Sequence, residues 1–261
     1  MNNPLSYIVE LSQDSEKWKI HIWELKDIDS HIAYLINDKT KNIIEGNKDV
    51  NVTAVKKSFL KSLDGKDENK KMGIIAEFFM HLYLHHEGYK QNFLFQNLEE
   101  NSMKKGFDGV YSKSNVIWVA ESKSGKGYGK PEAEKHRDKI QEAYNGLTNM
   151  LQGKNNPWRN AYNHAAHRDV ESSEDIIRQL NQLSQEFESE NYCATDDMNI
   201  ILQSVIFIND EWEAIDNAAI KQKVRQLAQN FKYKELEIIC LTKKSVDIFI
   251  DFLKQDMDTN K

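Results

Sequence analysis

Two short segments decide the fold of this chain, Gly106-Phe107-Asp108-Gly109-Val110 and Val116-Ile117-Trp118-Val119-Ala120-Glu121-Ser122-Lys123. Residues 116–120 are apolar and include β-branched and aromatic side chains, which is typical of a buried strand. Residues 104–113 have turn signals at both ends and a single aspartate near the centre. We expect the two segments to pair as a hairpin that turns around residues 112–115.

This pairing brings charged side chains of two adjacent strands together. Asp108 is expected level with Glu121 and Lys123, and alternation puts Glu121 and Lys123 on one face with Ser122 turned away. Half-buried like charges are costly unless something compensates them. Asp108 and Glu121 offer the hard oxygen ligands that Mg²⁺ takes, with Mn²⁺ as a substitute. Lys123 is then free to orient a water molecule or to stabilise charge on a phosphoryl oxygen.

A third carboxylate precedes the hairpin in Gly73-Ile74-Ile75-Ala76-Glu77-Phe78-Phe79-Met80. Glu77 has apolar neighbours on both sides within a predicted helix (71–87), so we expect it to face inward rather than to solvent. The alternative for the hairpin is that Asp108 is a turn residue and Glu-x-Lys a solvated strand end. A β-turn-β context with an apolar second strand favours the site.

Asp-(x)n-Glu-x-Lys on adjacent strands resembles the PD-(D/E)XK nuclease superfamily, whose core runs helix, three-stranded meander, helix, strand. Phe107 stands where that motif has its proline. Gly-x-x-x-Glu at 73–77, Lys-Gly-Phe-Asp-Gly-Val at 105–110 and Trp-x-x-Glu-x-Lys at 118–123 look closest to the nuclease subunit of the Hachiman anti-phage defence system. The likeness is good over about residues 70–125. It implies a Mg²⁺-dependent DNA endonuclease that leaves 5′-phosphate and 3′-hydroxyl ends and acts with a superfamily 2 helicase.

Composition fits a soluble globular protein of the cytoplasm. Charged residues make up 29% and hydrophobic residues 39% of the 261 residues. No apolar run is long enough to span a bilayer, and the N-terminal residues lack the pattern of a secretory signal. The two cysteines, Cys193 and Cys240, are far apart and have no zinc-type spacing, so we expect free thiols in a reducing compartment.

The net charge of −6 argues against a protein that coats nucleic acid by bulk charge. DNA affinity is therefore expected to be local or to come from a partner. Residues 124–131 combine three glycines, two lysines and a tyrosine, and are either a linker or a flexible phosphate-contacting loop. Further along the chain, the aromatic and basic residues at 155–168 are expected to stack on bases or to contact the nucleic-acid backbone. The candidate nucleic-acid contacts are Lys126, Lys130, Lys135, Arg137, Trp158 and Arg159.

The element pattern predicts an α/β protein with a restriction-endonuclease-like core, in which helices flank a mixed central sheet. Residues 1–66 are expected to form an N-terminal α/β layer with strands at 5–11 and 17–25. Residues 67–261 are expected to form the nuclease-like domain, with a helical insertion at about 124–197. Further core strands are expected at 91–98, 198–208 and 235–241, and a late helix at 212–231.

Two other functions agree with the same residues. One is a non-catalytic module that binds nucleic acid or a partner on the same fold, which the acidic net charge favours slightly. The other is an interaction protein in which Glu77, Asp108, Glu121 and Lys123 form a structural ion-pair network. A retained set of three carboxylates plus a lysine favours the nuclease, because a decayed site would be expected to lack one of them.

Overall fold

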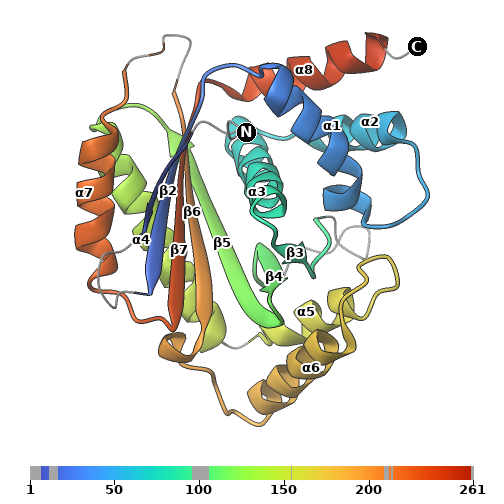
Figure 1. The fold of residues 1–261 in the computed structure, drawn as a ribbon, viewed down its shortest axis with the longest axis vertical. Coiled ribbons are helices and arrows are strands. Elements are labelled where there is room, and N and C mark those ends of the chain that lie inside the picture. Colours follow the sequence, from blue (N-terminus) through green and yellow to red (C-terminus); the bar gives the residue numbers. More distant parts are fainter. Residues whose placement is uncertain are drawn as a thin grey trace.

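The computed structural model describes residues 7–11, 17–95, 106–153, 155–208, 212 and 214–259, and these form a mixed α/β fold (Figure 1). Its sheet has seven strands in the order β1-β2-β7-β6-β5-β4-β3. The strands are β1 (Tyr7–Leu11), β2 (Trp18–Leu25), β3 (Lys90–Gln91), β4 (Gly109–Lys113), β5 (Val116–Lys126), β6 (Asn199–Phe207) and β7 (Glu235–Lys243). The four central strands, β2, β7, β6 and β5, are parallel, and β1, β4 and β3 join antiparallel at the edges.

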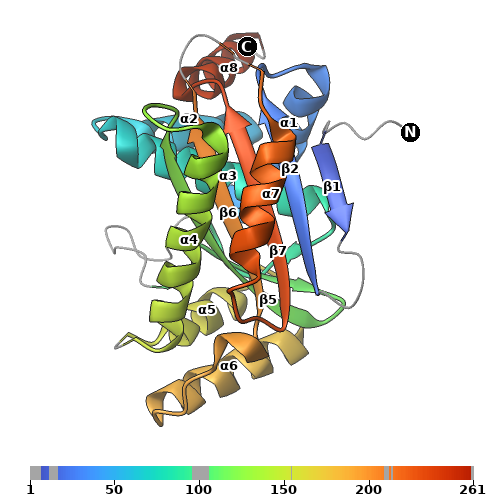
Figure 2. The same ribbon diagram turned by 90° about the vertical axis from the view of Figure 1, so that its left-hand side faces the viewer.

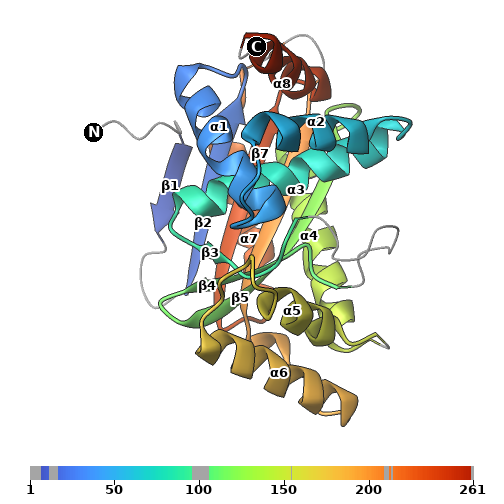
Figure 3. The same cartoon turned by 90° about the vertical axis from the view of Figure 1, so that its right-hand side faces the viewer.

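Helices cover both faces of the sheet (Figure 2, Figure 3). They are α1 (Ser30–Glu45), α2 (Val52–Leu63), α3 (Glu68–His86), α4 (Glu132–Leu151), α5 (Pro157–Ala165), α6 (Glu174–Glu188), α7 (Asn217–Ala228) and α8 (Val246–Thr259), with a 3-10 turn at Thr195–Asp197. One core cluster joins the sheet to α1, α2, α3 and α8, and another joins it to α4, α5, α6 and α7. Neighbouring side chains of one strand thus enter different cores.

The β4–β5 hairpin forms as the sequence predicts. Ser114 and Asn115 have φ values of 52° and 61°, the left-handed pair that a two-residue turn requires. Gly109 pairs with Ala120 and Lys113 with Val116. Residues 124–126, expected as part of a flexible loop, instead continue β5 and pair with residues 205–207 of β6. This strand is long because β6 supplies a hydrogen-bonding neighbour from Trp118 to Lys126, well beyond the end of the pairing with β4.

Two other elements differ in extent from the prediction. β3 is only Lys90–Gln91, where a strand over 91–98 was expected, and residues 96–98 lie outside the described part. Pairing with β4 stops after two residues, and Asn92 then donates its backbone N–H to Val110 outside the ladder. Helix α7 was expected to begin at residue 212 but begins at Asn217. Asp216 caps it there, because its side chain accepts a hydrogen bond from the Ala219 N–H.

The N-terminal segment shares the sheet and the core with the rest of the chain. β2 lies beside β7, and the ring centroids of Trp23 and Phe79 are 5.8 Å apart. The Phe59 ring in α2 lies 5.6 Å from that of Phe78 in α3. Within the predicted insertion, α4 packs on β5 and β6, whereas α5 and α6 pack on each other at one end of the sheet (Figure 1).

No helix in the described ranges is long and apolar enough to cross a membrane.

Lys243, at the end of β7, is a buried amine that we expect to destabilise the fold. Its Nζ donates to the Ser245 carbonyl oxygen at 2.6 Å and lies 5.4 Å from the centre of the Phe79 ring. Burial lowers the pKa of this ammonium from 10.5 to about 7, with Asp247 opposing the shift. Because folding disfavours the charged form, stability contributed by this group falls as the pH drops from 10.5 to 7 and stays low below pH 7.

Replacing Lys243 by methionine is therefore expected to raise the free energy of unfolding by about 2 kcal/mol at pH 7, since no buried charge remains. The gain should shrink toward pH 10. Urea unfolding at both pH values measures it, with the neighbouring Lys244→Met as a control expected to change little. If Lys243→Met were less stable than the wild type at pH 7, the contacts of the amine would contribute more to the stability of the fold than its burial costs.

Candidate active site

Glu121 and Lys123 form an ion pair on one face of β5. The Lys123 Nζ lies 2.5 Å from the Glu121 Oε1. Glu121 is 5% exposed, whereas the Lys123 side chain is 27% exposed, so the pair reaches the surface through the lysine. The second carboxylate oxygen, Oε2, is buried and has no hydrogen-bond partner among the described residues. A buried carboxylate oxygen without a donor is costly, which marks Glu121 as a group that the fold holds for a purpose other than stability.

Asp108 lies opposite Glu121, as the hairpin predicts. It is one residue beyond the Gly109–Ala120 pair of the ladder, and its Oδ2 accepts a hydrogen bond from the Ser122 N–H at 2.9 Å. The Ser122 side chain turns to the other face, where its hydroxyl donates to the Gln203 Oε1 at 2.7 Å. The predicted alternation along β5 is confirmed.

Glu77 comes from α3 and lies close enough for its charge to act on the hairpin. Burial is the main cause that raises the pKa of Glu121 and of Tyr111, and the negative charges of Asp108 and Glu77 raise both further. One helical turn after Glu77, the His81 Nδ1 lies 2.6 Å from the Tyr111 hydroxyl. This hydrogen bond ties α3 to β4 and so fixes where Glu77 lies relative to Asp108.

The electrostatics of the site are those of a crowded acidic cluster. Burial, and next the charge of Asp108, raise the pKa of Glu121 from 4.5 to about 8, although Lys123 lowers it. Burial lowers the pKa of Lys123, but Glu121, Asp108 and Glu142 together outweigh it and the pKa ends above 10.5. Lys123 is thus an ammonium ion at neutral pH and supplies positive charge rather than a base.

The donor chemistry of the cluster fits a divalent cation. When all three acids are ionised, three carboxylates and one ammonium leave two net negative charges, which is the charge that Mg²⁺ neutralises. The Glu121 Oε2 has no donor among the described residues. The three acids are not arranged as a finished centre, because no group of three His, Cys, Asp or Glu in the described ranges could hold an ion as it stands. Binding of metal by Glu77, Asp108 and Glu121 stays a prediction.

The cations expected to contact DNA all have partners within the chain. Lys126 pairs with Glu68, Lys130 lies 2.8 Å from Asp138, and Lys135 donates to the Gly127 carbonyl oxygen. Arg137 pairs with Asp138 and Glu134. The pairs are exposed, so a phosphate competes with each acid at little cost, but the surface offers no unneutralised basic stripe at these positions.

The prediction that Trp158 stacks on a base is wrong for this fold. The indole is fully buried, and its ring lies 4.8 Å from that of Phe107 in an edge-on contact. Asn156 caps the first turn of α5 and directs Trp158 inward, which leaves Arg159 on the surface, 3.4 Å from Glu188. Trp158 packs behind the hairpin residue that precedes Asp108, so its role is to support the site.

A model of the HamA protein family matches residues 2–257. The chain belongs to the HamA family. This is the family of the Hachiman defence protein, so the chain is a component of Hachiman anti-phage defence and the predicted likeness to that system is confirmed. No curated protein is similar enough to count as a match.

Sequence reasoning missed several residues that shape the site of this HamA chain. Tyr111 lies over Gly109, where an added Cβ would approach the Tyr111 Cε2 to 2.6 Å, so Gly109 is needed beside Asp108. Gly146 in α4 faces Glu121 in a similar way. A glycine inside a predicted helix is a signal that could have pointed to Gly146. No signal in the sequence connects Tyr111 to His81.

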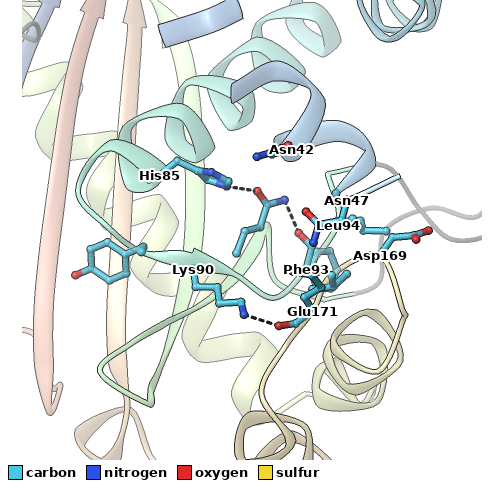
Figure 4. A pocket seen from close by; sticks show the side chains of 12 residues that line it. Asn42, Asn47, His85, Lys90, Phe93, Leu94, Asp169 and Glu171 are labelled. Carbon is cyan, nitrogen blue, oxygen red and sulfur yellow. Dashed lines mark hydrogen bonds between the residues drawn. The ribbon is translucent and has the colours of Figure 1, made fainter. Parts of the chain in front are cut away.

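A pocket of about 240 Å³ elsewhere in this HamA chain does not add to the site (Figure 4). It lies between the end of α1, β3 and residues 169–171. Its polar groups bond to one another: the His85 Nε2 lies 2.7 Å from the Gln91 Oε1, and the Gln91 Nε2 donates to the Phe93 carbonyl oxygen at 2.7 Å. His85 is therefore held by a hydrogen bond to Gln91 within this pocket.

Proposed function

We propose that this HamA protein is a metal-dependent nuclease that hydrolyses DNA phosphodiester bonds as the effector of its defence system. The observation that carries the proposal is the Glu121 carboxylate, which is buried beside Lys123 with one oxygen lacking a donor. The charges of Asp108 and Glu77 act on it as well. A stability role does not account for a buried carboxylate that has one lysine as its partner and two further acids acting on it, whereas a bound cation and a phosphate do.

The side chains divide the work by their chemistry. Glu77, Asp108 and Glu121 would hold Mg²⁺ or Mn²⁺, which when bound lowers the pKa of a water molecule and offsets charge on the phosphate. Asp108 also fixes the strand backbone by accepting from the Ser122 N–H. Lys123 remains protonated at neutral pH and reaches the surface, so it is suited to stabilise the phosphate charge that develops during attack or to orient the water.

The arrangement of elements supports a restriction-endonuclease-like core. Helix α3 precedes β3, β4 and β5, which form an antiparallel meander, and α4 then crosses to the parallel strand β6. This is the helix, three-stranded meander, helix, strand order of the PD-(D/E)XK superfamily that the motif resembles. Asp108 immediately precedes its second strand, Glu121 lies on its third strand, and Glu77 lies on its first helix.

A helicase partner of superfamily 2 is part of the proposal. The net charge is −6, and every cation expected to contact DNA already has an acid or a carbonyl oxygen beside it. Affinity from these side chains alone is expected to be weak, because phosphate contacts supply most of the affinity for nucleic acid. A motor subunit that holds the strand would deliver it to Lys123.

The same pairing of cations favours one other function, a module that binds a protein partner and does not cut. The test is cleavage of supercoiled plasmid and of linear single- and double-stranded DNA by the wild-type chain, alone and with its co-purified partner. Mg²⁺- or Mn²⁺-dependent cutting that EDTA abolishes, with 5′-phosphate ends, is the result we expect. No cutting in either form, together with partner capture, would establish the binding module instead.

A further inference from the structure

Gly146 lies inside α4, where glycine is the least favourable residue apart from proline. Its backbone does not require glycine, because its φ is not among the positive values found in this chain. It is half-buried, and Ala143 and Leu147 beside it are fully buried in the core against the sheet. An alanine at 146 would therefore strengthen the helix, provided that there were room for its methyl group.

The Glu121 side chain limits the room for a methyl group at residue 146. A Cβ on Gly146 would lie 3.2 Å from the Glu121 Oε1 and 3.8 Å from its Cδ and Cγ. The contact with the oxygen is tighter than ordinary packing, so either the helix or the carboxylate must move. Oε1 is the oxygen that accepts from Lys123, so a moved carboxylate weakens that bond.

Helix α4 is anchored and is not expected to yield. His136 forms a buried polar bridge from the helix to the sheet. Its Nδ1 lies 2.8 Å from the Ser204 Oγ, and its Nε2 lies 3.0 Å from the Thr242 Oγ1. Near Gly146, the Tyr144 ring stacks on Phe231 with centroids 3.9 Å apart. These contacts hold the helix on the N-terminal side of Gly146, and on its other side Leu147 and Leu151 are fully buried in the core. We therefore expect the carboxylate to be the group that moves.

We propose that Gly146 is a positioning residue, which keeps open the space in which the Glu121 carboxylate faces Lys123 and is oriented to bind a metal ion. The proposal rests on the proposed function as far as metal is concerned. Its geometric part, that residue 146 sets the orientation of the Glu121 carboxylate, stands without it. A group that orients a metal ligand typically affects metal affinity or activity 10- to 100-fold.

Gly146→Ala separates stability from function. We expect its thermal midpoint in EDTA to rise by about 2 °C, because a glycine is removed from a helix interior. Mn²⁺ affinity, measured by isothermal titration calorimetry, and Mg²⁺-dependent cleavage are each expected to fall about tenfold. Asn145→Ala is the matched control: it also improves helix propensity, but it lies on the exposed face of the same turn and should leave both unchanged.

A second measurement does not depend on metal or cleavage. Crystal structures of wild type, Gly146→Ala and Asn145→Ala in EDTA give the distance between the Lys123 Nζ and the Glu121 Oε1, which is expected to lengthen from 2.5 Å only in Gly146→Ala. An unchanged carboxylate position in Gly146→Ala would overturn the proposal, whether the variant is stabilised or destabilised. If wild type neither binds Mn²⁺ nor cuts DNA while the carboxylate still moves, the proposed function fails and the positioning role holds.

Discussion

Glu121→Gln is expected to be more stable than the wild type in EDTA at pH 8, by on the order of 3 kcal/mol. The pKa of this carboxyl is about 8 in the fold and 4.5 as its ordinary value, because burial and Asp108 disfavour its ionised form. Folding therefore favours the protonated form. The stability associated with this group is complete below pH 4.5 and is lost as the pH rises to 8. Glutamine has the same shape and never ionises.

Urea unfolding of both proteins between pH 5 and pH 8 measures this effect. The free energies of unfolding of the two proteins should be nearly equal at pH 5, and the variant should become the more stable one as the pH rises. Glu142→Gln, on the exposed side of α4, is the matched control and should follow the wild type. A Glu121→Gln protein that loses stability with pH as steeply as the wild type would place the titrating group elsewhere.

The same substitution is expected to abolish divalent-metal binding, because an amide is a poor substitute for a carboxylate ligand. In the wild type, the Mn²⁺ affinity should rise with pH up to about 8, as the proton on Glu121 no longer competes with the metal. Calorimetry in buffers of different ionisation heat would detect the released proton. Equal Mn²⁺ affinity in wild type and Glu121→Gln would remove Glu121 from the ligand set.

Lys123→Ala is expected to lower the rate of DNA cleavage at least 100-fold while Mn²⁺ binding at pH 8.5 changes by less than about threefold. The ammonium is not a metal ligand. Its pKa lies above 10.5, so the loss is that of a positive charge beside the phosphate. Lys126→Ala removes an ammonium from the same strand, paired with Glu68 at the surface, and should change the rate only slightly. A Lys123→Ala protein that cuts as fast as the wild type would refute this role.

The sequence predicts the placement of Asp108 opposite Glu121 because local geometry fixes it. A two-residue turn at Ser114–Asn115 sets the register, and the register alone brings Asp108 level with Glu121. The alternation of side chains along β5 then places Ser122 on the opposite face of the sheet from Glu121 and Lys123. Glu77 was expected to face inward from its apolar flanks, and its effect on Glu121 agrees with that position.

Features that depend on distant parts of the chain could not be predicted. Lys126 is neutralised by Glu68, 58 residues earlier, and nothing in either segment indicates the pair. The aromatic and basic residues at 155–168 suggest a nucleic-acid surface by composition, yet the period of α5 buries Trp158 and exposes Arg159. The space opposite Gly146 appears only when α4 lies on β5.

The most direct test of the central claim is the initial rate of Mg²⁺-dependent cleavage of supercoiled plasmid by wild type, Glu121→Ala and Lys123→Ala, purified identically and with the defence partner present. We predict nicking by the wild type that EDTA abolishes and that falls at least 100-fold in both variants. Cleavage that persists at the wild-type rate in both variants would contradict the claim that Glu121 and Lys123 form the active site.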